Sequence, residues 1–153
     1  MVESGDFVLL DFGAIHAGYC SDITRTVVVG KASDDQRDVY DAVRLAQDKA
    51  CVEVRAGMRG READAIARDF LKGAGFADGF GHSLGHGIGL EVHEGPRLAS
   101  SAEGILPLDA VVTVEPGVYR AGWGGVRIED DVLIAAAGPR RLTDFPRALL
   151  ELT

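Results

Sequence analysis

Four acidic residues stand inside runs of apolar, β-prone residues, and this placement limits how the 153-residue chain can fold. The runs are FVLLDF (7–12), DITRTVVVG (22–30), AVVTVEPGVY (110–119) and GGVRIEDDVLIAA (124–136), and the acids are Asp11, Asp22, Glu115 and Glu129. Enrichment in β-branched and aromatic residues predicts a strand for each run. Because an unpaired carboxylate is costly to bury, the strands must bring these acids either to solvent or to a shared positive partner.

The spacing of the first two acids predicts a hairpin. Gly18 in IHAGYCS (15–21) supplies a turn between the first two runs, and Asp11 and Asp22 are equidistant from the 16/17 position. A hairpin that turns there places the two aspartates directly opposite each other, with Cα atoms about 4.5 to 5.5 Å apart. Like charges in this arrangement destabilise the pair unless a cation lies between them.

The other two acids repeat the arrangement. Glu115 and Glu129 are equidistant from Gly122 in the glycine-rich turn AGWGG (121–125), so a hairpin centred there again makes two carboxylates face each other. A bound metal ion relieves the repulsion in both hairpins. The alternative is that the acids lie in turns or on a solvated face, for which the run Glu129, Asp130 and Asp131 is suited.

Two helices are predicted between the hairpins. Ser33, Asp34 and Asp35 provide capping oxygens and negative charge at a helix start, and apolar residues follow at helical spacing. The first helix is expected at 34–55 and the second at about 61–73, between glycines. GIGLEVHE (87–94) predicts a further strand and FPRALLEL (145–152) a short terminal helix. The expected class is α+β with a largely antiparallel sheet.

Composition excludes several classes of function. A net charge of −8 without a Lys/Arg cluster argues against nucleic acid as a partner and favours cations. The chain has no run of 18 apolar residues, and no membrane association is expected. Cys20 and Cys51 form no C-x-x-C pair, which favours free thiols in a reducing compartment and predicts a cytoplasmic protein.

Three of the four histidines lie in one glycine-rich segment, GHSLGHGIGLEVHEGP (81–96). They are His82, His86 and His93, whereas His16 sits at the tip of the first predicted hairpin and receives no role. Histidines among glycines are either loop residues bonded to backbone or ligands that the chain brings close to an ion. Together with the two pairs of acids, the segment favours a metal site.

Five motifs in order carry a family resemblance. LLDFGA (9–14), GYCSDITRT (18–26), the histidine segment, VVTVEPGVY (111–119) and GVRIEDDVLI (125–134) resemble the pita-bread metallopeptidases, and among them the Xaa-Pro branch of prolidases and aminopeptidases P. The resemblance implies a curved, mostly antiparallel sheet with helices on its outer face. It also implies that residues 1–153 are a partial metallopeptidase catalytic domain, the C-terminal part, without the N-terminal domain and the start of the catalytic domain.

The resemblance implies a site that holds two divalent metal ions. Asp11, Asp22, His86, Glu115 and Glu129 match the five ligands, with Asp22 and Glu129 bridging the ions. An oxygen-rich set with one imidazole suits Mn²⁺ best, with Co²⁺ or Zn²⁺ as alternatives.

Four residues match catalytic roles in the family. Glu115 matches the proton acceptor as well as a ligand. His82 and His93 match substrate-binding histidines that contact the carbonyl and the developing oxyanion. Arg127 matches an arginine that steadies the ligand network.

The function that the resemblance implies is hydrolysis of the X-Pro peptide bond in a dipeptide or short peptide, by a hydroxide bridging two metal ions. Two alternatives stay open: a metal-binding piece that is catalytically incomplete, and a non-catalytic pita-bread module that binds proteins. A partial fold leaves sheet edges uncovered, so homo-oligomerisation or pairing with the missing N-terminal portion is expected. The choice between dipeptidase and aminopeptidase is left open.

Overall fold

The computed structural model describes all 153 residues. Two long strands, β1 (Phe7–His16) and β2 (Tyr19–Val29), are followed by helices α1 (Asp34–Glu53) and α2 (Gly60–Gly73) and a 3-10 turn, η1 (Ala77–Gly79). The remaining strands are short: β3 (Gly85–Gly87), β4 (Glu94–Leu98), β5 (Val111–Val114), β6 (Gly117–Arg120), β7 (Gly124–Arg127), β8 (Asp130–Ala135), β9 (Gly138–Arg141) and β10 (Glu151–Leu152).

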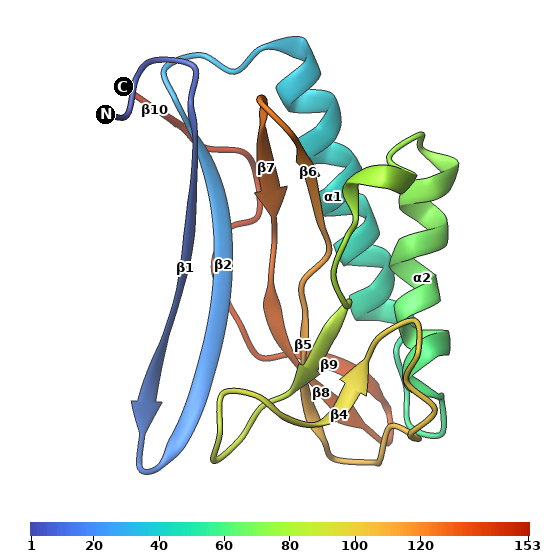
Figure 1. The fold of residues 1–153 in the computed structure, drawn as a ribbon. Helices are drawn as coiled ribbons and strands as arrows, with labels where there is room; N and C mark the ends of the chain where they lie inside the picture. Colours follow the sequence, from blue (N-terminus) through green and yellow to red (C-terminus); the bar gives the residue numbers. More distant parts are fainter.

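These strands form three sheets. Their orders are β1-β2-β10, β4-β3-β5-β8-β9 and β6-β7, and every pairing is antiparallel except that of β10 with β2. Figure 1 shows the β1–β2 hairpin on one side, both helices on the other, and β5 to β8 between them. The predicted α+β class with mostly antiparallel strands and helices on one outer face is confirmed.

Both helices bury one face against the strands. α1 begins at the predicted residue because the Ser33 hydroxyl accepts a hydrogen bond from Gln36 N at 3.2 Å, while Ser33 N donates to Gln36 Oε1 at 2.9 Å. It ends two residues earlier than predicted, and α2 begins one residue earlier. Their apolar faces join a core of 22 buried residues that includes Val43, Leu71, Leu84, Leu98, Val132 and Ile134.

The first hairpin forms, but its register differs from the prediction by two residues. Asp11 pairs with Thr24 and Asp22 with Gly13, so the two aspartates lie diagonally rather than directly opposite. The turn falls at Ala17 and Gly18, whose φ angles of 50° and 85° suit a two-residue loop that matches the twist of the strands. Because the shift is an even number, both aspartates keep the same face of the hairpin.

The second hairpin has the predicted centre. Val114 pairs with Asp130 in the five-stranded sheet, and Gly117 pairs with Arg127 in the two-stranded sheet, so both ladders are symmetric about Gly122. Glu115 and Glu129 fall between the two ladders, at equivalent positions on the two arms.

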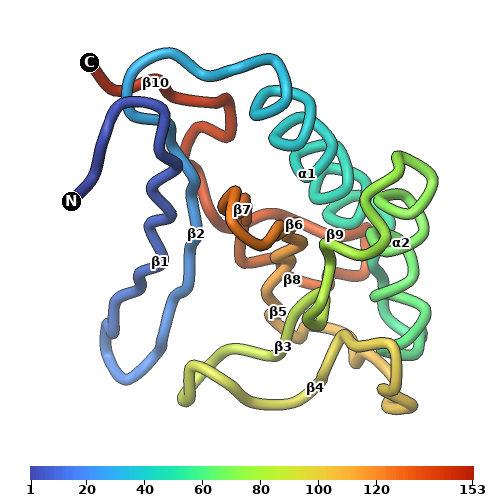
Figure 2. Tube along the Cα trace, turned by 45° about the horizontal axis from the view of Figure 1, so that its top comes forward, coloured from blue at the N-terminus to red at the C-terminus, as the bar shows by residue number.

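The segment 87–94 is not the single strand that was predicted. β3 ends at Gly87, β4 begins at Glu94, and a register shift between His86 and Gly87 breaks the ladder. The backbone packs closely against neighbouring strands at two glycines. A Cβ on Gly85 would lie 2.0 Å from Thr113 O, and a Cβ on Gly87 would lie 2.1 Å from Gly95 O. The intervening residues therefore form a loop beside the first hairpin, as Figure 2 shows.

The predicted terminal helix at 145–152 is also wrong. The segment is irregular and ends in β10, which pairs with β2 in parallel. Pro146 lacks a backbone donor, and the carbonyl oxygens of Phe145 and Pro146 accept hydrogen bonds from Arg25 rather than from a helical turn. Tertiary contacts thus determine the path of this segment.

Cys20 and Cys51 are both free thiols, as predicted. Neither helix is sufficiently long and apolar to traverse a lipid bilayer.

Candidate metal centre

Three side chains from distant parts of the chain converge beside the first hairpin. Asp22 on β2, His86 on β3 and Glu129, which precedes β8, each offer a ligand atom, and these atoms all lie within 4.8 Å of one another. Glu129 is 2% exposed and His86 9%. Two carboxylates and one imidazole at this separation form a donor set for a divalent cation.

The other two predicted ligands line the same cavity, which has a volume of about 450 Å³. Glu115 Oε1 lies 3.4 Å from His86 Nε2, and the half-exposed Asp11 forms an ion pair with Arg127. The titratable side chains of the cavity wall are Asp11, Asp22, His86, His93, Glu115 and Glu129. The structure therefore brings all five predicted ligands together.

The backbone fixes the orientation of His86. Its Nδ1 lies 3.0 Å from Gly87 O, and a carbonyl oxygen can only accept, so Nδ1 carries the proton and Nε2 presents a lone pair to the cavity. Thr113 links this histidine to Glu115, because its hydroxyl accepts from His86 N at 3.1 Å and donates to Glu115 Oε1 at 3.1 Å. The imidazole is thus presented in the tautomer that a metal ion requires.

A second threonine holds Glu129. The Thr24 hydroxyl donates to Glu129 Oε2 at 2.5 Å and accepts from Arg127 Nε at 3.2 Å. Arg127 also donates from Nη1 to the Tyr119 hydroxyl at 2.8 Å and from Nη2 to Asp11. Arg127 therefore contacts Asp11 directly and Glu129 through Thr24.

Burial, followed by repulsion from neighbouring acids, raises the pKa values of three carboxyls of the site. Burial raises the pKa of Glu129 to about 8, with a further rise from the charge of Glu115. Burial raises the pKa of Glu115 to about 7, and burial followed by the charge of Asp11 raises the pKa of Asp22. Carboxyls that repel one another and retain protons fit a site that is completed by divalent cations, since a cation removes the repulsion.

The other two histidines of the segment border a larger cavity of about 880 Å³. His93 lies against His86, with ring centroids 4.3 Å apart. His82 Nδ1 lies 2.8 Å from Ser83 O, whereas its buried Nε2 has no protein partner, and burial lowers the pKa of this histidine. His82 is therefore a neutral imidazole with a hydrogen-bond acceptor that no residue of the chain uses.

Comparison with known proteins identifies the family. The sequence profile of metallopeptidase family M24 matches residues 1–136. The chain belongs to metallopeptidase family M24. The resemblance carried by the five motifs is thereby confirmed.

Individual relatives place this M24 chain near proline-directed peptidases. It is 49% identical to an Xaa-Pro dipeptidase of Pyrococcus furiosus over 149 residues, which are 97% of this chain and 43% of the relative. It superposes on an Xaa-Pro dipeptidase from Bacillus anthracis with a TM-score of 0.95 and 51% identity, covering 98% of this chain and 42% of that one.

An X-Pro aminopeptidase from Thermotoga maritima gives a TM-score of 0.94 and 46% identity, covering 99% of the M24 chain and 43% of the other. The chain thus spans less than half the length of these relatives. Both substrate classes are represented among its neighbours, so the likeness does not separate dipeptidase from aminopeptidase.

Sequence reasoning did not single out four residues that contact the predicted site residues or line the larger cavity beside them: Thr24, Arg97, Thr113 and Tyr119. Thr24 and Thr113 each stand two residues from a predicted ligand, on the same face of an extended segment, so period-2 alternation could have found them. Arg97 pairs with His86 across β3 and β4 and lines the larger cavity without an ion pair of its own. No local pattern singles out Tyr119, which depends on its contact with Arg127.

Proposed function

We propose that this M24 chain is the metal-binding part of a proline-specific exopeptidase, and that residues 1–153 form part of its catalytic domain. The observation that carries the proposal is the convergence of Asp22, His86 and Glu129 within 4.8 Å, in a cavity that also contains Asp11 and Glu115. Relatives named Xaa-Pro dipeptidase and X-Pro aminopeptidase support the X-Pro bond as the target.

Two divalent ions fit the donor set. Asp22 and Glu129 would bridge them, Asp11 would complete one, and His86 with Glu115 would complete the other. The four carboxylates offset the four positive charges of the ions. Five ligand side chains with only one nitrogen among them favour Mn²⁺, with Co²⁺ or Zn²⁺ as weaker alternatives.

The chain supplies the proton transfers around this centre. When bound, two divalent ions lower the pKa of a water that they share and polarise the scissile carbonyl. Glu115 presents a carboxylate at the cavity wall, 3.4 Å from His86 Nε2, where it accepts a proton and returns it to the leaving proline nitrogen. Thr113 holds this carboxylate in place.

The larger cavity is the proposed substrate site. His93 is next to His86 and contacts the substrate carbonyl. His82 borders the same cavity and is the second proposed substrate-binding histidine. Arg97 has no ion pair within the chain, so its guanidinium is available for the C-terminal carboxylate of a dipeptide. Arg127 holds Asp11 and Thr24 rather than substrate.

The second candidate is metal binding without turnover, and the first hairpin favours it. Several large apolar side chains of β1 and β2 are exposed: Leu10 45%, Phe12 55%, Ile15 72% and Tyr19 64%. Such a surface calls for a partner, so we also propose pairing with further sequence of the same protein or with a second copy. A stable monomer in light scattering would contradict the pairing.

The free thiols support a cytoplasmic location.

Metal analysis combined with a peptidase assay tests the function. We expect two Mn²⁺ per chain, release of proline from an X-Pro dipeptide, and loss of nearly all turnover in Glu115→Gln. Glu103→Gln, which changes an exposed glutamate paired with Arg59 and Arg61, is the matched control and should retain activity. Two bound ions without turnover would support the second candidate, and turnover that survives exhaustive chelation would rule out the first.

A further inference from the structure

Arg25 occupies a buried position behind the metal centre. It follows Thr24 on β2 and therefore projects from the opposite face of the strand, and it is only 3% exposed. A guanidinium has five N–H donors, and every one has an acceptor within the chain. Nε donates to Pro146 O (3.0 Å), Nη1 to Thr24 O (2.8 Å) and Glu129 O (2.6 Å), and Nη2 to Asp130 Oδ1 (2.7 Å) and Phe145 O (2.9 Å).

Two of these acceptors lie where the two hairpins cross. Thr24 and Glu129 form an isolated β-bridge, in which Glu129 N donates to Thr24 O at 3.1 Å. Arg25 Nη1 donates to the carbonyl oxygens of both residues and so stabilises the bridge from the face of β2 opposite to Thr24. Asp22 is two residues before Thr24 on the same face of β2, so this bridge holds the segments that carry Asp22 and Glu129 beside each other.

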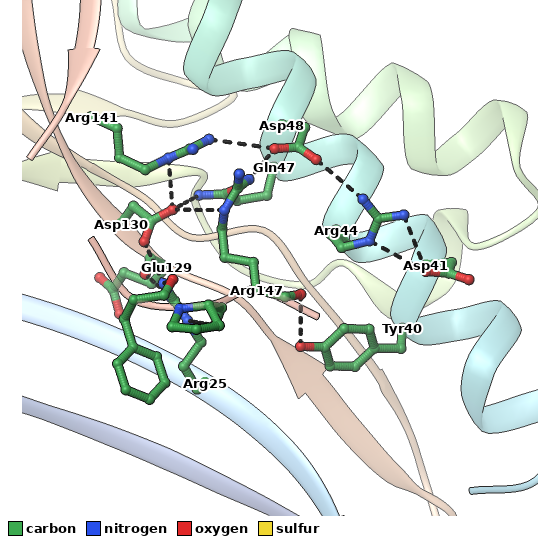
Figure 3. Close-up of polar contacts among 12 residues, drawn as sticks. Arg25, Tyr40, Asp41, Arg44, Gln47, Asp48, Glu129, Asp130, Arg141 and Arg147 are labelled. Carbon is green, nitrogen blue, oxygen red and sulfur yellow. Dashed lines mark hydrogen bonds and ion pairs between the residues drawn. The ribbon is translucent and has the colours of Figure 1, made fainter. Parts of the chain in front are cut away.

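Asp130 connects Arg25 and the Thr24–Glu129 bridge to the rest of the fold. Its carboxylate is fully buried, and Gln47, Arg141 and Arg147 lie beside it in addition to Arg25, as Figure 3 shows. Its Oδ2 accepts from Gln47 Nε2 on α1 at 2.7 Å and pairs with Arg141 Nε on β9 at 2.9 Å and Arg147 Nε at 3.7 Å. Residue 130 is thereby anchored to α1 and to β9, and the backbone that carries Glu129 is anchored with it.

We propose that Arg25 and Asp130 are positioning residues that hold Asp22 and Glu129 at the separation needed to share two metal ions. The inference rests on the proposed function, since it concerns the same ligands. A buried ion pair adds little to stability compared with apolar residues of similar volume, whereas the five directed hydrogen bonds of Arg25 define a geometry. Lysine has the same charge but only three donors on a flexible stem, so Arg25→Lys removes the geometry and keeps the charge.

Cobalt binding tests the proposal independently of activity, because the visible absorption of Co²⁺ reports coordination geometry. Thermal unfolding first establishes that each variant is folded, and Co²⁺ titration then gives stoichiometry, affinity and spectrum. We expect wild type to bind two ions, and folded Arg25→Lys and Asp130→Asn to bind about 10- to 100-fold more weakly with an altered spectrum. Arg37→Lys, which changes an exposed arginine paired with Glu151, should match wild type.

Folded Arg25→Lys with the affinity and spectrum of wild type would overturn the positioning role. If Arg25→Lys does not fold, folded Asp130→Asn with unchanged cobalt binding has the same meaning. Unfolding of both variants also overturns the proposal, since the pair would then be required for folding in general. Wild type that binds no Co²⁺ would instead overturn the proposed function.

Discussion

The Thr24 hydroxyl lies 2.5 Å from Glu129 Oε2, although 105 residues separate the two in sequence. The backbone joins the same residues, because Glu129 N donates to Thr24 O at 3.1 Å. Arg127 Nε can only donate, so its contact with Thr24 Oγ1 directs the hydroxyl proton toward Glu129. One threonine therefore fixes both the main chain and the carboxylate of a proposed bridging ligand.

Thr24→Val tests this relationship, since valine keeps the side-chain shape and removes the hydroxyl. We expect metal affinity to fall about 10-fold or more, because the Glu129 carboxylate loses its orienting donor. The metal-free protein should lose about 1 to 3 kcal/mol of stability, because a buried acceptor loses its partner. Calorimetric metal titration and urea unfolding measure the two effects.

Thr26→Val is the matched control for that change. Thr26 lies on the same face of β2 and is equally buried, but its hydroxyl bonds only to the backbone of Arg127. Thr26→Val should lower the stability of the protein and leave its metal affinity within about twofold of wild type. Equal losses of affinity in both variants would show that Thr24 acts through general packing.

Stability of the metal-free protein should depend on pH through the buried glutamates. The pKa of Glu129 rises from 4.5 to about 8 and that of Glu115 from 4.5 to about 7 on folding. Between these limits the folded state holds protons that the unfolded state releases. The stability that these two glutamates contribute is therefore fully present below pH 4.5 and is lost as pH rises toward 8. A loss of at least about 2 kcal/mol is expected.

Thermal unfolding in chelator between pH 5 and pH 9 measures this dependence. Glu129→Gln cannot ionise and should flatten the profile relative to wild type. Added Mn²⁺ should restore the stability of wild type at high pH, because bound cations favour the ionised carboxylates. A wild-type profile that stays flat in chelator would contradict the assigned pKa values.

Arg97→Ala tests the proposed recognition of a substrate carboxylate. In a preparation that hydrolyses X-Pro dipeptides, KM should rise about 10- to 100-fold, as expected for the loss of a charged hydrogen bond, with a smaller change in kcat. A dipeptide amide, which lacks the carboxylate, should be hydrolysed equally by variant and wild type. Arg55→Ala, at an exposed arginine that bonds only to Glu53 O, is the control. An unchanged KM would assign the carboxylate to another group.

The convergence of the predicted acidic ligands could be predicted because it depends on the geometry of two hairpins, which the sequence spacing indicates. Glu115 and Glu129 are symmetric about Gly122, and the two ladders on either side of them keep that symmetry. The same argument predicts the first hairpin. Its turn, however, falls at Ala17 and Gly18, and this position of the turn places Asp11 and Asp22 diagonally instead of directly opposite. Because side chains alternate along a strand, the two aspartates still lie on the same face of the hairpin although the predicted register is wrong.

Features that depend on distant partners could not be predicted. A helix was predicted at 145–152, but the carbonyl oxygens of Phe145 and Pro146 accept hydrogen bonds from Arg25, and the helix does not form. Tyr119 and Asp130 likewise gain their roles from contacts with Arg127 and Arg25. A one-dimensional pattern contains no information on which arginine reaches which acceptor.

The glycines of the histidine segment are unequal, and a saturation mutagenesis library would separate them. Gly85 has no room for a Cβ, which would meet the Thr113 carbonyl at 2.0 Å, whereas a Cβ at Gly81 would have nothing within 4 Å. Position 81 will therefore accept many residues and position 85 only glycine. Residue changes in this segment are therefore tolerated at its first position, whereas the close backbone approach next to His86 requires glycine.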